Sequence, residues 1–138
     1  MAIIDADNAV LGRLASIVAK RLLNGEEITI VNAEKAVIVG NKYSIIERYQ
    51  ERRNIGSVRK GPYYPTMPDR ILRRTIRGML PMKKSHGKKA YNRLKVYMGI
   101  PKEYQGKKFE IVEDAKNNKL EGFITLKDLS IQLGAKLR

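Results

Sequence analysis

Hydrophobic residues in the first third of the chain follow two patterns. Short, nearly continuous apolar runs predict three strands, over residues 2–5, 28–31 and 36–39. Between the first two runs, apolar residues recur at helical spacing and predict a helix over about residues 9–23. Since apolar strands separated by a helix are typical of βαβ units, we expect an α/β fold with a parallel sheet.

The ends of this first helix carry capping signals. Asp7 or Asn8 can accept a hydrogen bond from a free backbone N–H at its start, and Asn24-Gly25 can end it. Its apolar positions form a broad face, as expected for a helix that packs on a sheet. They are Val10, Leu11, Leu14, Val18 and Leu22.

Beyond residue 40 the pattern is interrupted by basic loops. Residues 54–68 lack periodicity and hold three Pro and two Gly, and a second basic loop spans 81–87. Loops as long as the first are usually functional or disordered. We expect helices over residues 42–53 and 69–80, from about Lys88, and from Thr125 as cap to Leu133-Gly134, and strands over 94–98 and 109–112.

The charge of the chain is large and localised. The 138 residues include 28 Lys and Arg against 14 Asp and Glu, a net charge of +14. Residues 48–95 hold fifteen basic and two acidic residues, whereas residues 1–47 sum to −1 and residues 96–138 to +2. One strongly positive surface favours a polyanionic partner, nucleic acid first and an anionic membrane or acidic protein second.

The helix predicted over residues 69–80 concentrates this charge. Four arginines recur at i, i+3, i+4 and i+7 and fall within a sector of roughly 100°: Arg70, Arg73, Arg74 and Arg77. The opposite side is apolar and is expected to face a core: Leu72, Ile76 and Met79. Because stacked guanidinium groups repel one another and match phosphate geometry, this face predicts phosphate binding.

Other basic residues extend the predicted surface. Residues 57–64 interleave cations with tyrosines that could stack on unpaired bases or equally cap the core. The first helix has a narrow polar face, for which simple solvent exposure is slightly favoured over an RNA contact. The candidate RNA-binding residues are Arg13, Lys20, Arg59, Lys60, Tyr63, Arg70, Arg73, Arg74, Arg77, Lys83, Lys84, His86, Lys88, Lys89 and Arg93.

Enzyme chemistry finds little support in the sequence. There is no Cys, one His, no glycine-rich dinucleotide motif and no P-loop, so we expect no catalytic residue, metal or cofactor. Asp5 and Asp7 are better explained as a strand-end acid and a helix cap than as metal ligands. Two alternatives remain open: a magnesium-dependent nucleic-acid-processing enzyme using residues such as Asp114, and an RNA-binding translational regulator.

The sequence lacks the patterns of a membrane-bound or secreted protein. No stretch is apolar enough for a membrane span, and the N-terminus lacks the pattern of a secretion signal. We therefore expect a cytoplasmic protein with neither a membrane partner nor a small-molecule substrate.

Several motifs resemble the large ribosomal subunit protein thirteen family, in its archaeal form. They are Leu11-Gly12-Arg13-Leu14-Ala15-Ser16, Val31-Asn32-Ala33-Glu34, Arg59-Lys60-Gly61-Pro62, Arg77-Gly78-Met79-Leu80-Pro81 and Leu94-Lys95-Val96-Tyr97. The short connection between Gly25 and Ile28 is similar to archaeal members.

The resemblance implies a three-layer α/β/α fold with a small, mostly parallel central sheet and long basic loops. It also implies a single domain over residues 1–138, with an rRNA-binding region at about 48–95. The implied role is structural: binding large-subunit rRNA early in assembly, beside neighbouring large-subunit proteins and in cytoplasmic ribosomes.

Overall fold

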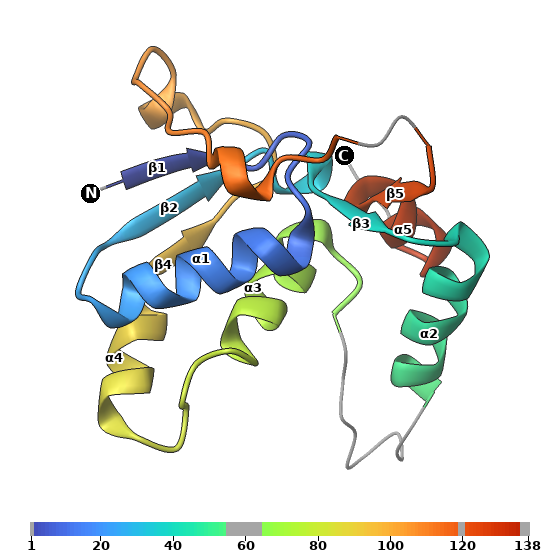
Figure 1. The fold of residues 1–138 in the computed structure, drawn as a ribbon, viewed down its shortest axis with the longest axis horizontal. Helices are drawn as coiled ribbons and strands as arrows, with labels where there is room; N and C mark the ends of the chain where they lie inside the picture. Colours follow the sequence, from blue (N-terminus) through green and yellow to red (C-terminus); the bar gives the residue numbers. More distant parts are fainter. Residues whose placement is uncertain (1, 55–64, 119–120, 136–138) are drawn as a thin grey trace.

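A computed structural model describes residues 2–54, 65–118 and 121–135 of the chain. The chain begins with a strand, a helix and a second strand, as the apolar pattern predicts (Figure 1). The strands are β1 (Ala2–Asp5), β2 (Ile28–Val31), β3 (Val37–Val39), β4 (Leu94–Val96) and β5 (Phe123–Thr125). The α-helices are α1 (Leu11–Leu23), α2 (Lys42–Asn54), α3 (Pro68–Arg77), α4 (Ser85–Asn92) and α5 (Leu126–Gln132), and short 3-10 turns lie at Ala33–Lys35, Lys102–Tyr104 and Glu113–Ala115.

Three parallel strands form the main sheet, in the order β1-β2-β4. Alternation along these strands divides their side chains between two faces. One face is buried with apolar residues of α1, α3 and α4, and its strand residues are Ile4, Ile28, Ile30 and Leu94. The βαβ unit made by β1, α1 and β2 and the predicted return of the chain at β4 are therefore confirmed.

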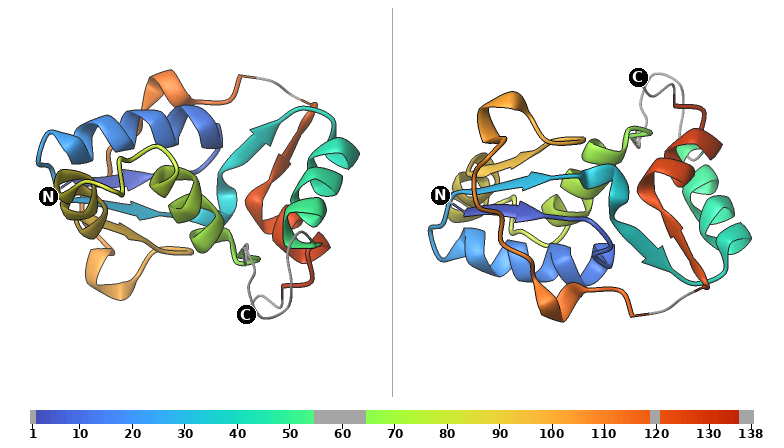
Figure 2. Two further views of the ribbon diagram at one scale, coloured as in Figure 1. Left: turned by 90° about the horizontal axis from the view of Figure 1, so that it is seen from below. Right: turned by 90° about the horizontal axis from the view of Figure 1, so that it is seen from above.

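The second face of the sheet has a thinner cover. Ile3 and Val31 point to this side and pack with the buried Tyr104, against which Tyr97 and Phe109 are placed. Figure 2 shows α1 on one side of the sheet and the segment after β4 on the other. The α/β class and the small parallel sheet are confirmed, and the layer opposite α1 consists of a 3-10 turn and aromatic side chains.

The apolar run at residues 36–39 forms β3, but in a separate sheet. β3 pairs antiparallel with β5, with Ile38 opposite Ile124 (Figure 2). Thr125 then caps α5, because its hydroxyl accepts the Asp128 N–H at 3.2 Å. The strand at 36–39 and the cap at Thr125 are therefore confirmed.

The predicted cap of α1 is wrong. The residue before α1 is Val10, and no side chain caps it. Asn8 has a φ of 59°, and its amide donates to the Asn117 carbonyl at 3.1 Å, so its side chain is engaged elsewhere. Asp7 gives its backbone N–H to the Asp5 carboxylate at 3.0 Å. The Asp7–Asp5 contact lies within the turn between β1 and α1, and the Asn8 contact ties that turn to Asn117.

Three other local predictions need correction. Residues 109–112 form no strand; Glu110 makes only an isolated parallel bridge to Ile4. Since α3 ends at Arg77, Met79 lies beyond the helix and is 42% exposed instead of facing the core. The short helix α4 begins at Ser85, three residues before the predicted start.

Candidate nucleic-acid interface

Helix α3 holds the predicted arginines at the surface. Pro68 occupies its first turn, where a fixed φ and a missing N–H cost nothing. The apolar side is buried through Ile71, Leu72 and Ile76, which anchors the helix. The other side is therefore fixed towards solvent, as the periodicity predicts.

Three of the four arginines are exposed. Arg70, Arg73 and Arg77 form no ion pair within the parts of the chain that the structure describes. Arg74 is half-buried and, with Tyr49, lines a cavity of about 380 Å³ between α1, α2 and α3. The row of charges on α3 is thus largely uncompensated.

A second basic cluster lies on and before α4. The backbone at Gly87 lies very close to Pro81: a Cβ at position 87 would be 2.0 Å from the Pro81 carbonyl oxygen, so only glycine fits there. This close approach folds the Pro81 loop tightly against the start of the helix. The exposed residues of the cluster are Lys83, Lys84, His86, Lys88 and Lys89.

One contact links the two clusters. The guanidinium of Arg73 lies over the Tyr91 ring of α4, at 4.4 Å from its centroid. Such cation–π contacts fix the plane of the guanidinium while leaving its edge free to donate hydrogen bonds. We call the α3 arginines and the α4 cluster, which this contact joins, the α3/α4 basic surface.

The remaining candidates are placed differently. Arg13 and Lys20 are exposed on α1, where the Ser16 hydroxyl donates to the Arg13 carbonyl at 2.9 Å. Arg93 donates from Nη1 to the Leu22 carbonyl at 2.9 Å, at the C-terminus of α1. Three further candidates lie outside the described residues: Arg59, Lys60 and Tyr63.

Lys95 is a cation that the sequence reasoning missed. It is exposed on β4 and lines a groove with Arg70 and Arg73 of α3. The signal was available, because alternation along 94–96 places Lys95 opposite the buried Leu94. The local pattern could not predict that β4 lies beside α3.

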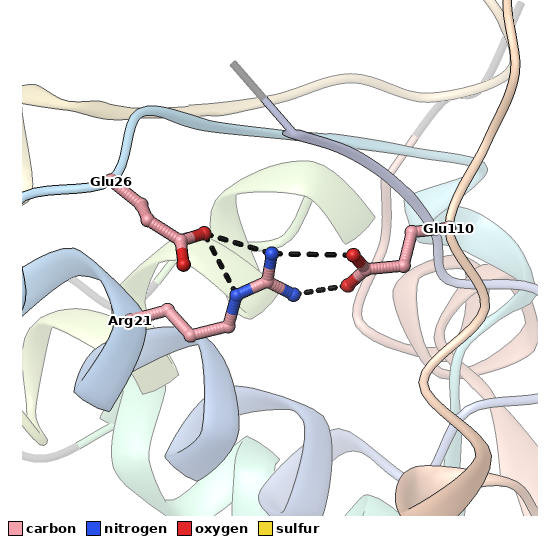
Figure 3. A network of polar contacts seen from close by, with 3 residues as sticks. All are labelled: Arg21, Glu26 and Glu110. Carbon is pink, nitrogen blue, oxygen red and sulfur yellow. Dashed lines mark hydrogen bonds and ion pairs between the residues drawn. The ribbon is translucent and has the colours of Figure 1, made fainter.

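A contrasting arginine shows what full compensation looks like in this fold. Arg21 lies between Glu26 and Glu110 and forms ion pairs with both carboxylates (Figure 3). Hydrogen bonds to Glu110 first, and to Glu26 second, raise the pKa of Arg21 above its ordinary value. This guanidinium ties α1 to the segment that pairs with β1 at Glu110, so its role is structural.

Other site types find no support in the described ranges 2–54, 65–118 and 121–135. They contain no group of three or more His, Asp or Glu side chains placed to hold a metal ion. In the same ranges, no helix has the length and apolar character that a membrane crossing requires.

These observations define a small α/β protein with a basic face on two neighbouring helices. The sequence model of the family described as "Ribosomal protein L13" matches residues 1–103. A relative from Archaeoglobus fulgidus named "Large ribosomal subunit protein uL13" is 56% identical, covering 96% of this chain and 86% of its own length. Relatives of the same name from Methanococcoides burtonii and Methanocaldococcus jannaschii are each 54% identical, over 99% of both chains.

The chain belongs to the ribosomal protein L13 family. The family match and these relatives confirm the resemblance to this family in its archaeal form. Membership also makes it a structural ribosomal protein of the large subunit, not an enzyme.

Proposed function

We propose that this protein binds large-subunit rRNA through the α3/α4 basic surface and stabilises the RNA fold early in assembly. The observation that carries this proposal is the row of exposed guanidinium groups on α3. Arg70, Arg73 and Arg77 have no carboxylate partner among the described residues, although each is held by a well-packed helix. Phosphates at this face relieve the mutual repulsion and accept hydrogen bonds from the guanidinium edges.

The extent of the interface follows from the charge distribution. We propose that the RNA-binding region spans about residues 48–95, which carry thirteen of the fourteen net charges. The α4 cluster would contact phosphates on one side of α3, with Arg13 and Lys20 of α1 as outer contacts. Contacts to neighbouring large-subunit proteins would use surfaces away from these helices.

We further propose that residues 1–138 act as one domain. One buried apolar cluster includes Ile4 of β1, Leu72 of α3 and Leu133 after α5, which supports folding as a unit.

Salt dependence tests the electrostatic part of the proposal. If about six phosphates are neutralised, log K for deproteinised archaeal large-subunit rRNA should fall against log salt with a slope of roughly −4 to −5. Replacing Arg70 and Arg77 by Gln should make that slope shallower by about 1.4–1.8. These two side chains are exposed, so the fold should be retained.

A matched variant controls for net charge. Lys35→Gln with Lys127→Gln removes the same charge from exposed positions outside residues 48–95. We expect the slope of this control to stay close to that of the unaltered protein. A nearly flat salt dependence, or equal effects of the two double variants, would contradict the proposed interface.

A further inference from the structure

A groove separates the start of α3 from the main sheet. It is lined by Asp69, Arg70 and Arg73 on α3 and by residues 94–97, and its volume is about 320 Å³. This volume is at the small end of the range for ligand pockets, so the groove suits one small chemical group better than a whole RNA or protein helix. The groove lies where Figure 1 shows β4 next to α3.

The floor of the groove is an unused strand edge. β4 is the last strand of the β1-β2-β4 sheet, and no further strand pairs with it among the described residues. Ile28 N–H donates to the Arg93 carbonyl at 3.1 Å, and Tyr97 N–H donates to the Ile30 carbonyl at 2.8 Å. The odd-numbered residues therefore face β2.

The even-numbered residues face the opposite way. In an extended strand the N–H and C=O of one residue point to the same side, and successive residues alternate. Leu94 and Val96 consequently direct their main-chain donors and acceptors away from β2. Leu94 is buried, whereas Val96 is half-buried and offers one N–H beside one C=O. This is the pattern that complements the edge of a nucleic-acid base.

The walls of the groove are cationic. Arg70 and Arg73 of α3 and Lys95 of β4 line it, together with one acidic residue, Asp69. The ring of Tyr91 holds the Arg73 guanidinium. Three cationic residues thus line the groove, two of them on a well-packed helix.

An extended acidic peptide is the other occupant to consider. It could pair with the β4 edge and place carboxylates near the arginines. However, β4 has only three residues, and only two of them direct main-chain groups away from β2. An added strand would therefore gain few main-chain hydrogen bonds. A base needs only one donor and one acceptor, and its phosphate uses the same cations.

We propose that this groove binds one unpaired nucleotide of the rRNA. Its base edge pairs with the main-chain N–H and C=O of Val96, and its phosphate is held by Arg70, Arg73 and Lys95. The inference rests on the proposed function and deepens it, because it assigns a single-stranded element of the RNA to one place on the fold.

Removal of one main-chain donor tests the pairing. Val96→Pro deletes the outward N–H without touching a ladder bond to β2, and proline is tolerated at such edge positions. Val96→Ala is the matched control, because it also shortens the side chain but keeps the N–H. With deproteinised archaeal large-subunit rRNA, Val96→Pro should bind about fivefold more weakly than Val96→Ala, as for one lost hydrogen bond.

Photocrosslinking of the unaltered protein gives a second readout that does not depend on a variant folding. Irradiation of its complex with the same rRNA, followed by trypsin, should give a nucleotide adduct on the peptide of residues 96–102. Equal affinities of the two Val96 variants together with adducts only elsewhere would overturn the groove assignment. If the unaltered protein still binds rRNA with a steep salt dependence in that case, the proposed function stands; absence of rRNA binding would remove both.

Discussion

The guanidinium carbon of Arg73 on α3 lies 4.4 Å from the centroid of the Tyr91 ring on α4. A flexible cation is thereby ordered before any partner arrives, which lowers the entropy lost when it binds a phosphate. Tyr91 is half-buried against the main core, so its ring is itself held in place. We infer that Tyr91 positions Arg73 for RNA binding.

Substitution of Tyr91 tests this positioning role. Tyr91→Leu should weaken rRNA binding by about two- to fivefold, because exposed cation–π contacts contribute roughly 0.5–1 kcal/mol. Tyr91→Phe keeps the ring and should retain most of the affinity. The measurement is a binding isotherm at fixed salt, and a Leu variant as tight as the unaltered protein would refute the inference.

A double-variant cycle separates positioning from a general loss of packing. In an Arg73→Met background the difference between Tyr91→Leu and Tyr91 should disappear, since the ring then has no guanidinium to hold. A difference that persists would mean that Tyr91 acts on RNA binding by another route.

Arg93 offers a prediction about stability. Its Nη1 donates to the Leu22 carbonyl at the last turn of α1, where free carbonyls and the negative end of the helix dipole favour a cation. Arg93→Met should lower the free energy of unfolding by about 1 kcal/mol. Urea denaturation measures this change, and Lys88→Met, at an exposed position of α4, is the control.

The same variant decides whether Arg93 also contacts RNA. At a temperature where Arg93→Met is fully folded, an unchanged rRNA affinity would restrict this residue to supporting α1. A loss as large as that of Arg70→Gln would assign it both roles.

Local patterns predicted those parts of the fold that depend on local sequence. The apolar face of α1 and the division of α3 into arginine and apolar sides follow from helical spacing. Thr125 as the cap of α5 follows from short-range hydrogen bonding. Each of these needs only residues within one or two turns of one another.

Long-range pairing was not predictable in the same way. The apolar run at β3 gives no sign that its partner is β5, near the C-terminus, and not β2. Residues 109–112 resemble a strand in sequence. Phe109 is apolar because it packs against the cluster of Tyr104 and Ile3, and not because it belongs to a strand. The Arg73–Tyr91 contact and the α3–β4 groove likewise depend on tertiary placement, so the site was predicted as a list of cations without its geometry.

Gly87 provides a prediction about backbone approach. A Cβ at this position would meet the Pro81 carbonyl oxygen at 2.0 Å and its carbon at 2.4 Å, so backbone must move to admit it. Gly87→Ala should destabilise the protein by more than about 2 kcal/mol, in the range of overpacked sites. Gly12 in α1 is the opposite case, because a Cβ added there would meet no atom within 4 Å. Gly12→Ala should therefore stabilise the protein by about 0.5–1 kcal/mol. Equal melting temperatures for the two variants would contradict this account.

The ion pairs of Arg21 lead to a prediction about pH. Because Glu110 and Glu26 raise the pKa of Arg21, its stabilising effect is complete below the ordinary arginine pKa and is lost only as pH rises through the raised value. Deprotonation of Arg21 therefore contributes no change in stability between about pH 6 and pH 9. Glu110 and Glu26 are about half exposed, so Arg21→Met should lower the free energy of unfolding by less than about 1 kcal/mol. Urea midpoints at pH 6 and pH 9 should show the same difference between the two proteins, and a difference that vanishes at pH 9 would contradict the assignment of this stabilisation to the Arg21 ion pairs.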